Sequence, residues 1–447
     1  MIQLERGLER YDPIRKAKLV RGFKFGFDLG FRGKVLSKSK ISNLKITKEL
    51  PHLVQKALDK EIKENRLLGP FTSPPFKEFQ INPIGLVPKS TPGSYRMIVD
   101  LSSPQGNSIN DSIDDIFAKV NYARLEDALS LVLKCGPTPY MAKTDIEKAF
   151  RLLPLNPDQY HLVGIFWEGH FYFDKCIPMG ARSSCQLFEE FSSAVEFIAK
   201  ERGVQFMVHY LDDFFLVNVS EVSCHKDLHS LLSTGSDIRV PWVVDKTVLP
   251  TRKTTFIGFE IDTVDEVVRL PNEKLLKCRE SIEALLTKSS CTLKTLQQLL
   301  GLLNFACTVV VPGRAFLQRL YALTVGVKQP YHFVKINTQA KQDLLLWLHF
   351  LKNFNGVTLY RTEMFLSPSA VNFYTDAAKS FGYGAVFGNH WFSERWASTW
   401  WSEQNITLLE LVSIVLALGA WGHIDRNLAL IINTDNQAGP GPSSCDQ

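Results

Sequence analysis

Three observations predict an α+β fold for this chain. Strand-like and helix-like runs alternate over about 51–262, which is typical of a mixed domain. Leucine stripes at helical spacing fill about 263–366, and strands flank a further helix within 367–447. A basic segment, 1–50, precedes them. We therefore predict four regions, the last of which is a smaller α/β domain.

The charge of the chain is concentrated near its beginning. The 447 residues are enough for several domains with hydrophobic cores, and their net charge is +5. Residues 1–66 carry 17 Lys/Arg against 8 Asp/Glu, whereas the remainder carries 34 against 38. This basic arm fits a polyanionic partner, although a solvated lysine-rich surface explains the charge equally well.

The sequence predicts neither a membrane partner nor secretion. The best apolar run, 411–421, has 11 residues and is too short to cross a bilayer. Charged residues interrupt the N-terminus where a signal peptide needs an apolar core. The eight cysteines are scattered without a Cys-x-x-Cys pair. We therefore expect an intracellular protein, in the cytoplasm or the nucleus, without a zinc ribbon.

Phenylalanine follows glycine every four residues from Gly22 to Phe31. This spacing places the aromatic rings on one face of a helix, although glycine weakens helices. We expect that face to dock on the protein core rather than to bind a ligand.

The second region begins with an amphipathic helix over 51–68, which the glycine and prolines of 69–75 end. Further along, apolar runs bounded by turn residues predict strands. These strands are expected at 84–87, 95–101 and 140–143, with a turn at 90–94 between the first two.

Two apolar stripes predict helices in the third region. They are Leu275, Ile282, Leu285 and Leu286, and then Leu296, Leu299, Leu300 and Leu303. In the last region we expect a helix over about 408–419 and strands near 371–374, 383–387 and 428–432. Residues 439–447 have a composition typical of disorder.

The most informative motif is Tyr210-Leu211-Asp212-Asp213. Its aspartates interrupt an apolar stretch, so we expect two strands and a turn with both carboxylates at the tip. Two carboxylates on a half-buried hairpin repel each other and are costly to desolvate unless a cation joins them. Mg²⁺, which prefers oxygen ligands, fulfils that requirement. Taken alone, the pair is also compatible with a solvated turn.

Asp145 adds a carboxylate at the end of the strand predicted at 140–143. On its own, it is equally plausible as the N-cap of the helical turn that follows. With Asp212 and Asp213, it completes the three-aspartate cluster that two-metal phosphoryl chemistry requires. We therefore expect two Mg²⁺ ions at this site, with Mn²⁺ as a substitute.

These motifs resemble the palm of a reverse transcriptase, and the resemblance covers roughly residues 11–437. The segment Cys176-Ile177-Pro178-Met179-Gly180-Ala181-Arg182-Ser183-Ser184 is similar to the one that packs against the incoming nucleotide and template. The Gly-Phe segment that begins at Gly22, and Asp100-Leu101-Ser102-Ser103-Pro104, resemble in particular the DIRS-like retrotransposons. The resemblance implies an RNA-directed DNA polymerase, a nucleotidyltransferase. Its right-hand fold implies fingers and palm over 51–262 and a helical thumb and connection over 263–366.

The resemblance also implies roles for single residues. Asp145, Asp212 and Asp213 match the metal-binding aspartates. Lys89 and Arg96 match the residues that hold the triphosphate, Phe150 the aromatic that blocks a ribose 2′-hydroxyl, and Lys246 a lysine near the pyrophosphate; Met179 and Gly180 line the nucleotide pocket. The alternatives are two exposed cations on a hairpin for Lys89 and Arg96, and a core aromatic for Phe150.

The last region resembles a ribonuclease H through Asp376, Glu410 and Asp435. Alone, Glu410 is explained as a favourable charge near a helix N-terminus. The family pattern continues after the third acid with a fourth carboxylate, whereas this sequence stops shortly after Asp435. We therefore expect an incomplete ribonuclease H-like domain over 367–447 whose metal-dependent hydrolase activity is impaired.

The expected partners are an RNA or DNA template with its primer, and dNTPs; the sequence leaves the oligomeric state open. A rival hypothesis is a catalytically inactive nucleic-acid-binding remnant of a mobile element. Such a remnant binds a duplex through its phosphates, with strong salt dependence, but extends no primer. A purely structural protein would do neither.

Overall fold

The computed structural model describes residues 1–35, 42–89, 93–358, 373–398 and 404–421. The chain divides into two compact units, Met1–Leu359 and Tyr360–Gln447. The turn expected at 90–94 lies partly outside the described residues, and the strand expected at 428–432 lies wholly outside them.

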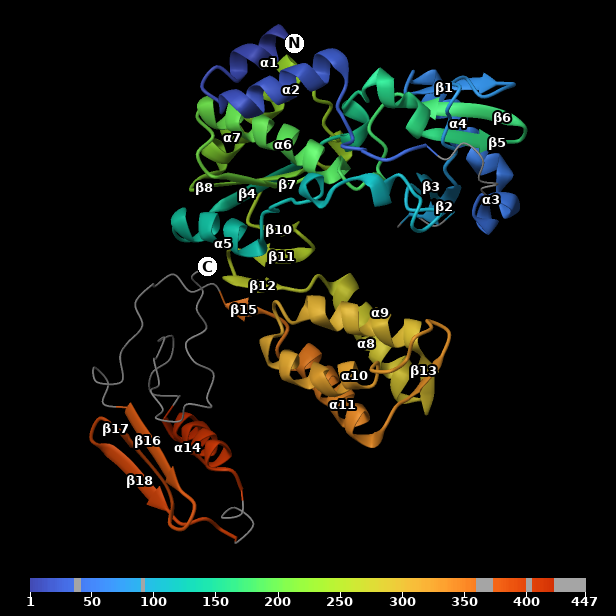
Figure 1. Ribbon diagram of the computed structural model, residues 1–447. Coiled ribbons are helices and arrows are strands. Elements are labelled where there is room, and N and C mark those ends of the chain that lie inside the picture. The colour runs from blue at the N-terminus through green and yellow to red at the C-terminus, as the bar shows by residue number, and fades with distance from the viewer. Residues whose placement is uncertain (36–41, 90–92, 359–372, 399–403, 422–447) are drawn as a thin grey trace. The chain divides into compact units, whose positions relative to one another are not determined.

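A four-stranded antiparallel sheet in the order β7-β8-β4-β9 occupies the centre of the first unit (Figure 1). Helices α6 and α7 cover one face of this central sheet, and α5 covers the other. The strands are β4 (Tyr140–Asp145), β7 (Met207–Tyr210), β8 (Asp213–Asn218) and β9 (Val248–Thr251); the helices are α5 (Leu125–Lys134), α6 (Ser184–Glu201) and α7 (Glu221–Ile238).

Strand β8 is buried on both faces of the central sheet. Phe214 and Leu216 pack into the core beneath α6 and α7, whereas Phe215 and Val217 pack into the core shared with α5. Successive side chains of a strand point to opposite faces, so a strand covered on both faces has a continuous apolar run. This arrangement explains the apolar residues that follow the two aspartates.

A smaller lobe contains the sheet β1-β6-β5 and the hairpin β2-β3. Its core includes Val54 and Leu58 of α4 together with Leu67, Ile84 and Ile165. The elements are α3 (Lys45–Glu49), α4 (Pro51–Lys63), β1 (Leu67–Phe71), β2 (Ile84–Pro88), β3 (Tyr95–Val99), β5 (Gly164–Trp167) and β6 (His170–Asp174).

The helix predicted over 51–68 is shorter in the structure. α4 ends at Lys63, and Asn65 adopts a left-handed conformation with φ +56°. Asparagine tolerates this conformation and commonly terminates helices. Residues Leu67–Phe71 pair with β6 instead, so cross-strand hydrogen bonds replace the last helical turn.

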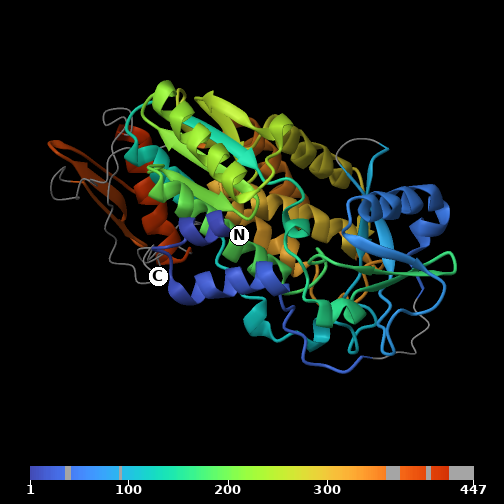
Figure 2. The ribbon, with the colours of Figure 1, turned by 90° about the horizontal axis from the view of Figure 1, so that it is seen from above.

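The N-terminal helices α1 (Ile2–Gly7) and α2 (Pro13–Phe25) dock on α7 and α6, respectively (Figures 1 and 2). The predicted core docking of the phenylalanines is confirmed, since Phe23 contacts Phe27 and Phe191, each with a centroid distance of 5.2 Å. The prediction that all three phenylalanines lie on one face of a helix was wrong. Gly26, at φ +89°, ends α2, and Phe27 and Phe31 follow in extended backbone.

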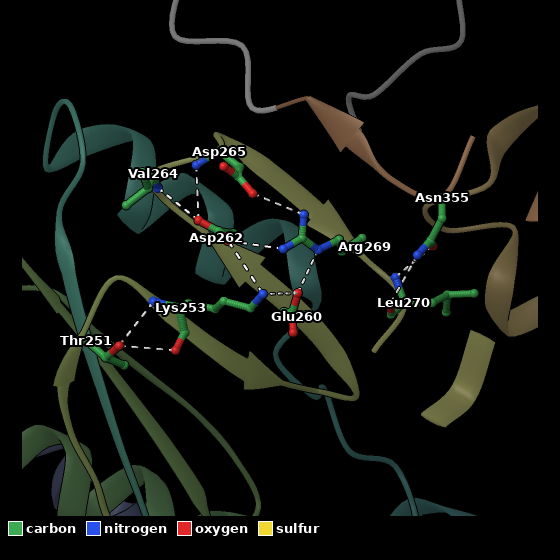
Figure 3. A network of polar contacts seen from close by, with 9 residues as sticks. All are labelled: Thr251, Lys253, Glu260, Asp262, Val264, Asp265, Arg269, Leu270 and Asn355. Carbon is green, nitrogen blue, oxygen red and sulfur yellow. Dashed lines mark hydrogen bonds and ion pairs between the residues drawn. The ribbon is translucent and has the colours of Figure 1, made fainter. Parts of the chain in front are cut away.

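A second sheet, β10-β11-β12-β15, lies beside the central one, and a polar network crosses it (Figure 3). Arg269 contacts the carboxylates of Glu260 at 2.6 Å, Asp262 at 3.1 Å and Asp265 at 3.3 Å. Lys253 contacts Glu260 at 3.1 Å from the other side. The strands are β10 (Lys253–Phe256), β11 (Phe259–Asp262), β12 (Val267–Arg269) and β15 (Val357–Thr358).

The helices expected in the third region are present. Leu296, Leu299, Leu300 and Leu303 are buried, as are Ile282 and Leu285, while Leu275 and Leu286 pack partly buried against the same core. The elements are α8 (Asn272–Leu286), α9 (Leu293–Ala306), α10 (Gln318–Ala322), α11 (Thr338–Asn353), β13 (Ser290–Thr292) and β14 (Phe333–Lys335). Short 3-10 helices lie at Asn110–Ser112 (η1), Asp115–Phe117 (η2), Ala149–Leu152 (η3), Pro157–Leu162 (η4), Val244–Lys246 (η5) and Val311–Leu317 (η6).

The second unit contains a three-stranded antiparallel sheet, β16-β17-β18, with α14 against β16 and β17. The strand expected at 383–387 and the helix expected at 408–419 are present, whereas β18 was not predicted. The elements are β16 (Phe373–Ala378), β17 (Gly382–Phe387), β18 (His390–Glu394) and α14 (Ile406–Trp421). Among the helices of the described residues, none has the length and apolarity of a membrane span.

A buried ion pair joins the smaller lobe to the end of the central sheet. Arg151 of η3 contacts Asp174 at the end of β6, and their side chains are only 15% and 7% exposed. Burial raises the pKa of the Asp174 carboxyl, and the Arg151 guanidinium opposes this shift. Arg151 also donates to Glu61 of α4 at 2.9 Å. One guanidinium thus connects three elements.

We expect Arg151→Met to lower the free energy of unfolding by about 3–5 kcal/mol, because it leaves the buried Asp174 carboxylate without its countercharge. Urea unfolding measures this change. Arg32→Met is the matched control, since Arg32 is 63% exposed in its pair with Asp28 and should cost at most about 1 kcal/mol. Equal losses in the two variants would contradict the assignment.

Candidate active site

β7 and β8 form the expected hairpin, with Leu211-Asp212 as its two-residue loop. Tyr210 lies opposite Asp213 in the strand register. Leu211 has φ +54°, a left-handed conformation that costs most residues other than glycine about 1–3 kcal/mol. The hairpin holds this strained backbone in place and thereby sets the position of Asp212.

Asp145 is the last residue of β4 and lies directly opposite Asp213 of β8. Backbone hydrogen bonds fix it from both sides. The Ile146 amide donates to the Asp212 carbonyl at 2.9 Å, and the Val243 amide donates to the Asp145 carbonyl at 2.8 Å. Asp145 therefore belongs to the sheet and is not the N-cap of η3, whose N-cap residue is Lys148.

The two hairpin aspartates are poorly solvated. Burial raises the pKa of Asp213 to about 6, and the charges of Asp145 and Asp212 add to the rise while Lys143 opposes it. Burial and then the charge of Asp145 raise the pKa of Asp212. These directions argue against a solvated turn, because water would stabilise both carboxylates. The cluster instead favours a neighbouring cation.

Two lysines supply positive charge to this cluster. The Lys246 ammonium lies 2.8 Å from Asp145 Oδ2, and the Lys143 ammonium lies 3.8 Å from Asp213 Oδ2. Within the described part of the chain, no three His, Cys, Asp or Glu side chains are already gathered as a metal-binding group. Asp145, Asp212 and Asp213 nevertheless provide oxygen donors that repel each other, which is the donor set that fits Mg²⁺ or Mn²⁺.

Gly180 marks a close approach of two backbone segments. A Cβ atom at this position would collide with the Val99 carbonyl oxygen. Asn110, which the sequence did not indicate, holds the segment: its Nδ2 donates to the Gly180 carbonyl at 2.9 Å, and its Oδ1 accepts from the Arg182 amide at 2.8 Å. Met179 is 49% exposed beside it and so accessible to a ligand.

The other predicted nucleotide contacts lie on separate elements. Lys89 is exposed where β2 ends, and Arg96 is exposed on β3. The positive charge of Arg96 reaches Asp212, where it opposes the pKa rise that burial causes. Phe150 is half-buried against Phe188 with a centroid distance of 5.1 Å, so the core-aromatic alternative stays open beside the nucleotide role.

A buried histidine beneath the hairpin was not predicted. His209 of β7 contacts Glu196 and lies 3.0 Å from Glu189, and both acids belong to α6. The histidine side chain is 7% exposed. Burial is the largest single contribution and lowers the pKa of His209. The two carboxylates together outweigh burial and raise this pKa to about 9. Hydrogen-bonded charge thus fastens β7 to α6.

The acids of the second unit are only partly described. Asp376 lies in β16 and Glu410 in α14, the strand and helix that pack against each other. The Asp376 carboxylate accepts a hydrogen bond from the Ala377 amide at 2.8 Å. Asp435 lies outside the described residues. The predicted ribonuclease H cluster therefore stays a prediction.

Comparison with protein families places a known domain at this site. Residues 87–261 match the family described as reverse transcriptase (RNA-dependent DNA polymerase). The chain is 23% identical over 347 residues to the Pro-Pol polyprotein of Simian foamy virus type 1, covering 75% of this chain and 28% of that protein. It is 25% identical over 179 residues to Protein P of Duck hepatitis B virus (isolate Shanghai/DHBVQCA34), covering 40% of this chain and 22% of that protein. The chain thus spans less than a third of the length of these relatives.

Solved structures show the same fold. A foamy viral protease-reverse transcriptase in complex with double-stranded DNA superimposes with a TM-score of 0.61 and 18% identity, covering 96% of this chain and 73% of that one. A foamy viral protease-reverse transcriptase with an RNA/DNA hybrid gives a TM-score of 0.58 at 18% identity, covering 96% and 56%. The predicted α+β polymerase fold is confirmed.

His209 predicts how stability depends on pH. Its pKa is about 9 in the folded protein and about 6.5 in the unfolded chain, so folding favours the protonated form. Its contribution is complete below pH 6.5 and is lost as the pH rises to 9. We expect the free energy of unfolding to fall by up to roughly 3 kcal/mol over this interval.

Chemical denaturation at a series of pH values measures this dependence. His209→Gln retains hydrogen-bonding groups but cannot titrate, so its curve should be flatter between pH 6.5 and 9. Buried cysteines also affect stability at alkaline pH, but they are common to both proteins and cancel in the difference. Parallel curves for the two proteins would contradict the charged state of His209.

Proposed function

We propose that this chain is an RNA-directed DNA polymerase that transfers a nucleotide from a dNTP to a primer 3′-hydroxyl. One observation carries the proposal: Asp145 and Asp213 face each other across paired strands, with Asp212 at the adjoining turn. This arrangement lies inside the segment that matches reverse transcriptases. Carboxylates clustered at the ends of paired strands suit phosphoryl transfer, which depends mainly on positioning and charge neutralisation.

Asp145, Asp212 and Asp213 are the residues that would hold two Mg²⁺ ions, or Mn²⁺. When bound, divalent cations supply charge neutralisation at the phosphate and lower the pKa of the attacking hydroxyl. The raised pKa values of Asp212 and Asp213 support this assignment, since a cation relieves the repulsion that contributes to them.

Residues around the carboxylates would orient the nucleotide. Arg96, whose charge already reaches Asp212, and Lys89 would bind the triphosphate, the first through its planar fork and the second as a point charge. Gly180 lets its segment approach the Val99 carbonyl closely, and Asn110 holds that segment in place. Phe150 and Met179 would form the apolar part of the proposed nucleotide site.

An RNA or DNA template with its primer is the proposed macromolecular partner. The similar solved structures are complexes with double-stranded DNA and with an RNA/DNA hybrid. The excess of basic residues in 1–66 suits a phosphate backbone. We further propose that the chain comes from a retrotransposon of the DIRS-like group. The Gly22–Phe31 segment and Asp100–Pro104 support this origin.

For the second unit we propose a ribonuclease H-like fold. The packing of β16 and β17 on α14 brings the elements of Asp376 and Glu410 together. A functional hydrolase centre would need Asp435 as well.

We expect Asp212→Asn to abolish primer extension on poly-rA/oligo-dT with Mg²⁺, because it removes a proposed metal-binding charge while keeping the shape of the side chain. Incorporation of labelled dTTP measures this loss. The control is Asp237→Asn, since Asp237 pairs with Arg202 on the surface of α7 and should leave extension unchanged.

Extension by Asp212→Asn at the wild-type rate would overturn the site assignment. No extension by the wild type, together with salt-sensitive binding to the primer-template, would favour the inactive nucleic-acid-binding remnant instead. Circular dichroism of each variant confirms that the fold is retained.

A further inference from the structure

The ion pair between Lys246 and Asp145 joins an exposed side chain to a largely buried carboxylate. The ammonium of Lys246 lies 2.8 Å from Asp145 Oδ2. The Lys246 side chain is 63% exposed, whereas that of Asp145 is only 17% exposed. The ion pair therefore has one partner that water surrounds and one that the protein largely encloses.

The backbone beneath Lys246 is anchored to β4. The Val243 amide donates to the Asp145 carbonyl at 2.8 Å, and the Thr247 and Thr144 hydroxyls lie 2.8 Å apart. Lys246 sits between these two anchors at the end of η5. Its Cα position is fixed relative to Asp145, so the flexible stem of the lysine alone decides whether the ammonium contacts the carboxylate.

A divalent cation and this ammonium compete for the same carboxylate. Asp145 Oδ2 accepts the Lys246 hydrogen bond, and a cation shared with Asp212 or Asp213 would need the Asp145 carboxylate as well. A lysine ammonium is protonated at neutral pH. Lys246 therefore offsets one of the three negative charges of the carboxylate cluster.

Lys143 differs from Lys246 in a way that separates their roles. Its side chain is 23% exposed, and its ammonium is 3.8 Å from Asp213, too far for a hydrogen bond. Lys143 is confined within the sheet, whereas Lys246 can move into solvent. Displacement of Lys246 therefore exchanges one exposed ion pair for a stronger contact with a divalent cation.

We propose that Lys246 is an internal counter-ion that competes with a divalent cation for the Asp145 carboxylate and is displaced when the metal binds. This proposal rests on the proposed function only in taking Asp145 as a metal ligand. Lys246 offsets part of the negative charge of the cluster before metal binding and weakens the affinity for the metal. The displaced ammonium remains tethered beside the site, where it can meet an anionic group of the substrate.

The test is Mn²⁺ binding to the full chain without nucleic acid or nucleotide, measured from the electron paramagnetic resonance signal of free Mn²⁺. We expect Lys246→Met to bind Mn²⁺ about three- to tenfold more tightly at the site that Asp145→Asn weakens. Lys246→Arg retains the competing charge and should bind as weakly as the wild type.

Lys253→Met is the matched control. It removes the same charge from a side chain that is 52% exposed and paired with Glu260 in the neighbouring sheet. We expect its Mn²⁺ affinity to stay within about twofold of wild type, because its charge is not held by Asp145. Equal tightening in Lys253→Met and Lys246→Met would show a general electrostatic effect and overturn the proposal.

A double variant tests whether Lys246 competes with the metal through Asp145. In an Asp145→Asn background, Lys246→Met should no longer tighten Mn²⁺ binding, since the side chain for which the two cations compete has lost its charge. Tightening that persists there, or unchanged or weaker binding in Lys246→Met alone, would refute the proposal. The measurement needs no primer extension, so an inactive wild type would sink the polymerase assignment without affecting this result.

Discussion

The antiparallel pairing of β4 with β8 is the constraint on which the rest of the site depends. Its register places Asp145 opposite Asp213, and the two-residue loop before β8 then puts Asp212 beside them. A slip of one residue would turn one carboxylate to the opposite face and move Phe214 and Phe215 into the wrong cores. The two hydrophobic cores on either side of the sheet prevent that slip, because Phe214 and Phe215 each fill a different core.

This register brings like charges together at a cost that the surrounding structure offsets. Burial and mutual repulsion disfavour the ionised carboxylates, and the left-handed Leu211 adds backbone strain. The strands, the backbone bonds around Asp145 and the charged contact of His209 with α6 hold the hairpin against these costs. The stability of the fold thus offsets the repulsion among the three carboxylates and holds them closer together than they would be in a flexible chain.

The sequence predicted what depends on local periodicity and missed what depends on distant pairing. The hairpin at Asp212, the strand that ends at Asp145 and the helical stripes follow from apolar spacing, and the structure contains them. β1 and β18 were missed because their pairing partners, rather than their own residues, stabilise them. His209 gains its role only from two glutamates of α6, and Asn110 only from a backbone segment seventy residues away. Lys143 could have been found, since alternation along β4 puts it on the same face as Asp145.

The three cations near the carboxylates differ in how the fold holds them. Lys143 comes from within the sheet and is confined near Asp213, whereas Lys246 follows an anchored turn and reaches Asp145 from solvent. Arg96 belongs to the β2-β3 hairpin and affects Asp212 only through its field. The three positive charges thus come from three different elements. Of the two lysines, only Lys246 can leave its carboxylate without disturbing the paired strands, because Lys143 is itself part of β4.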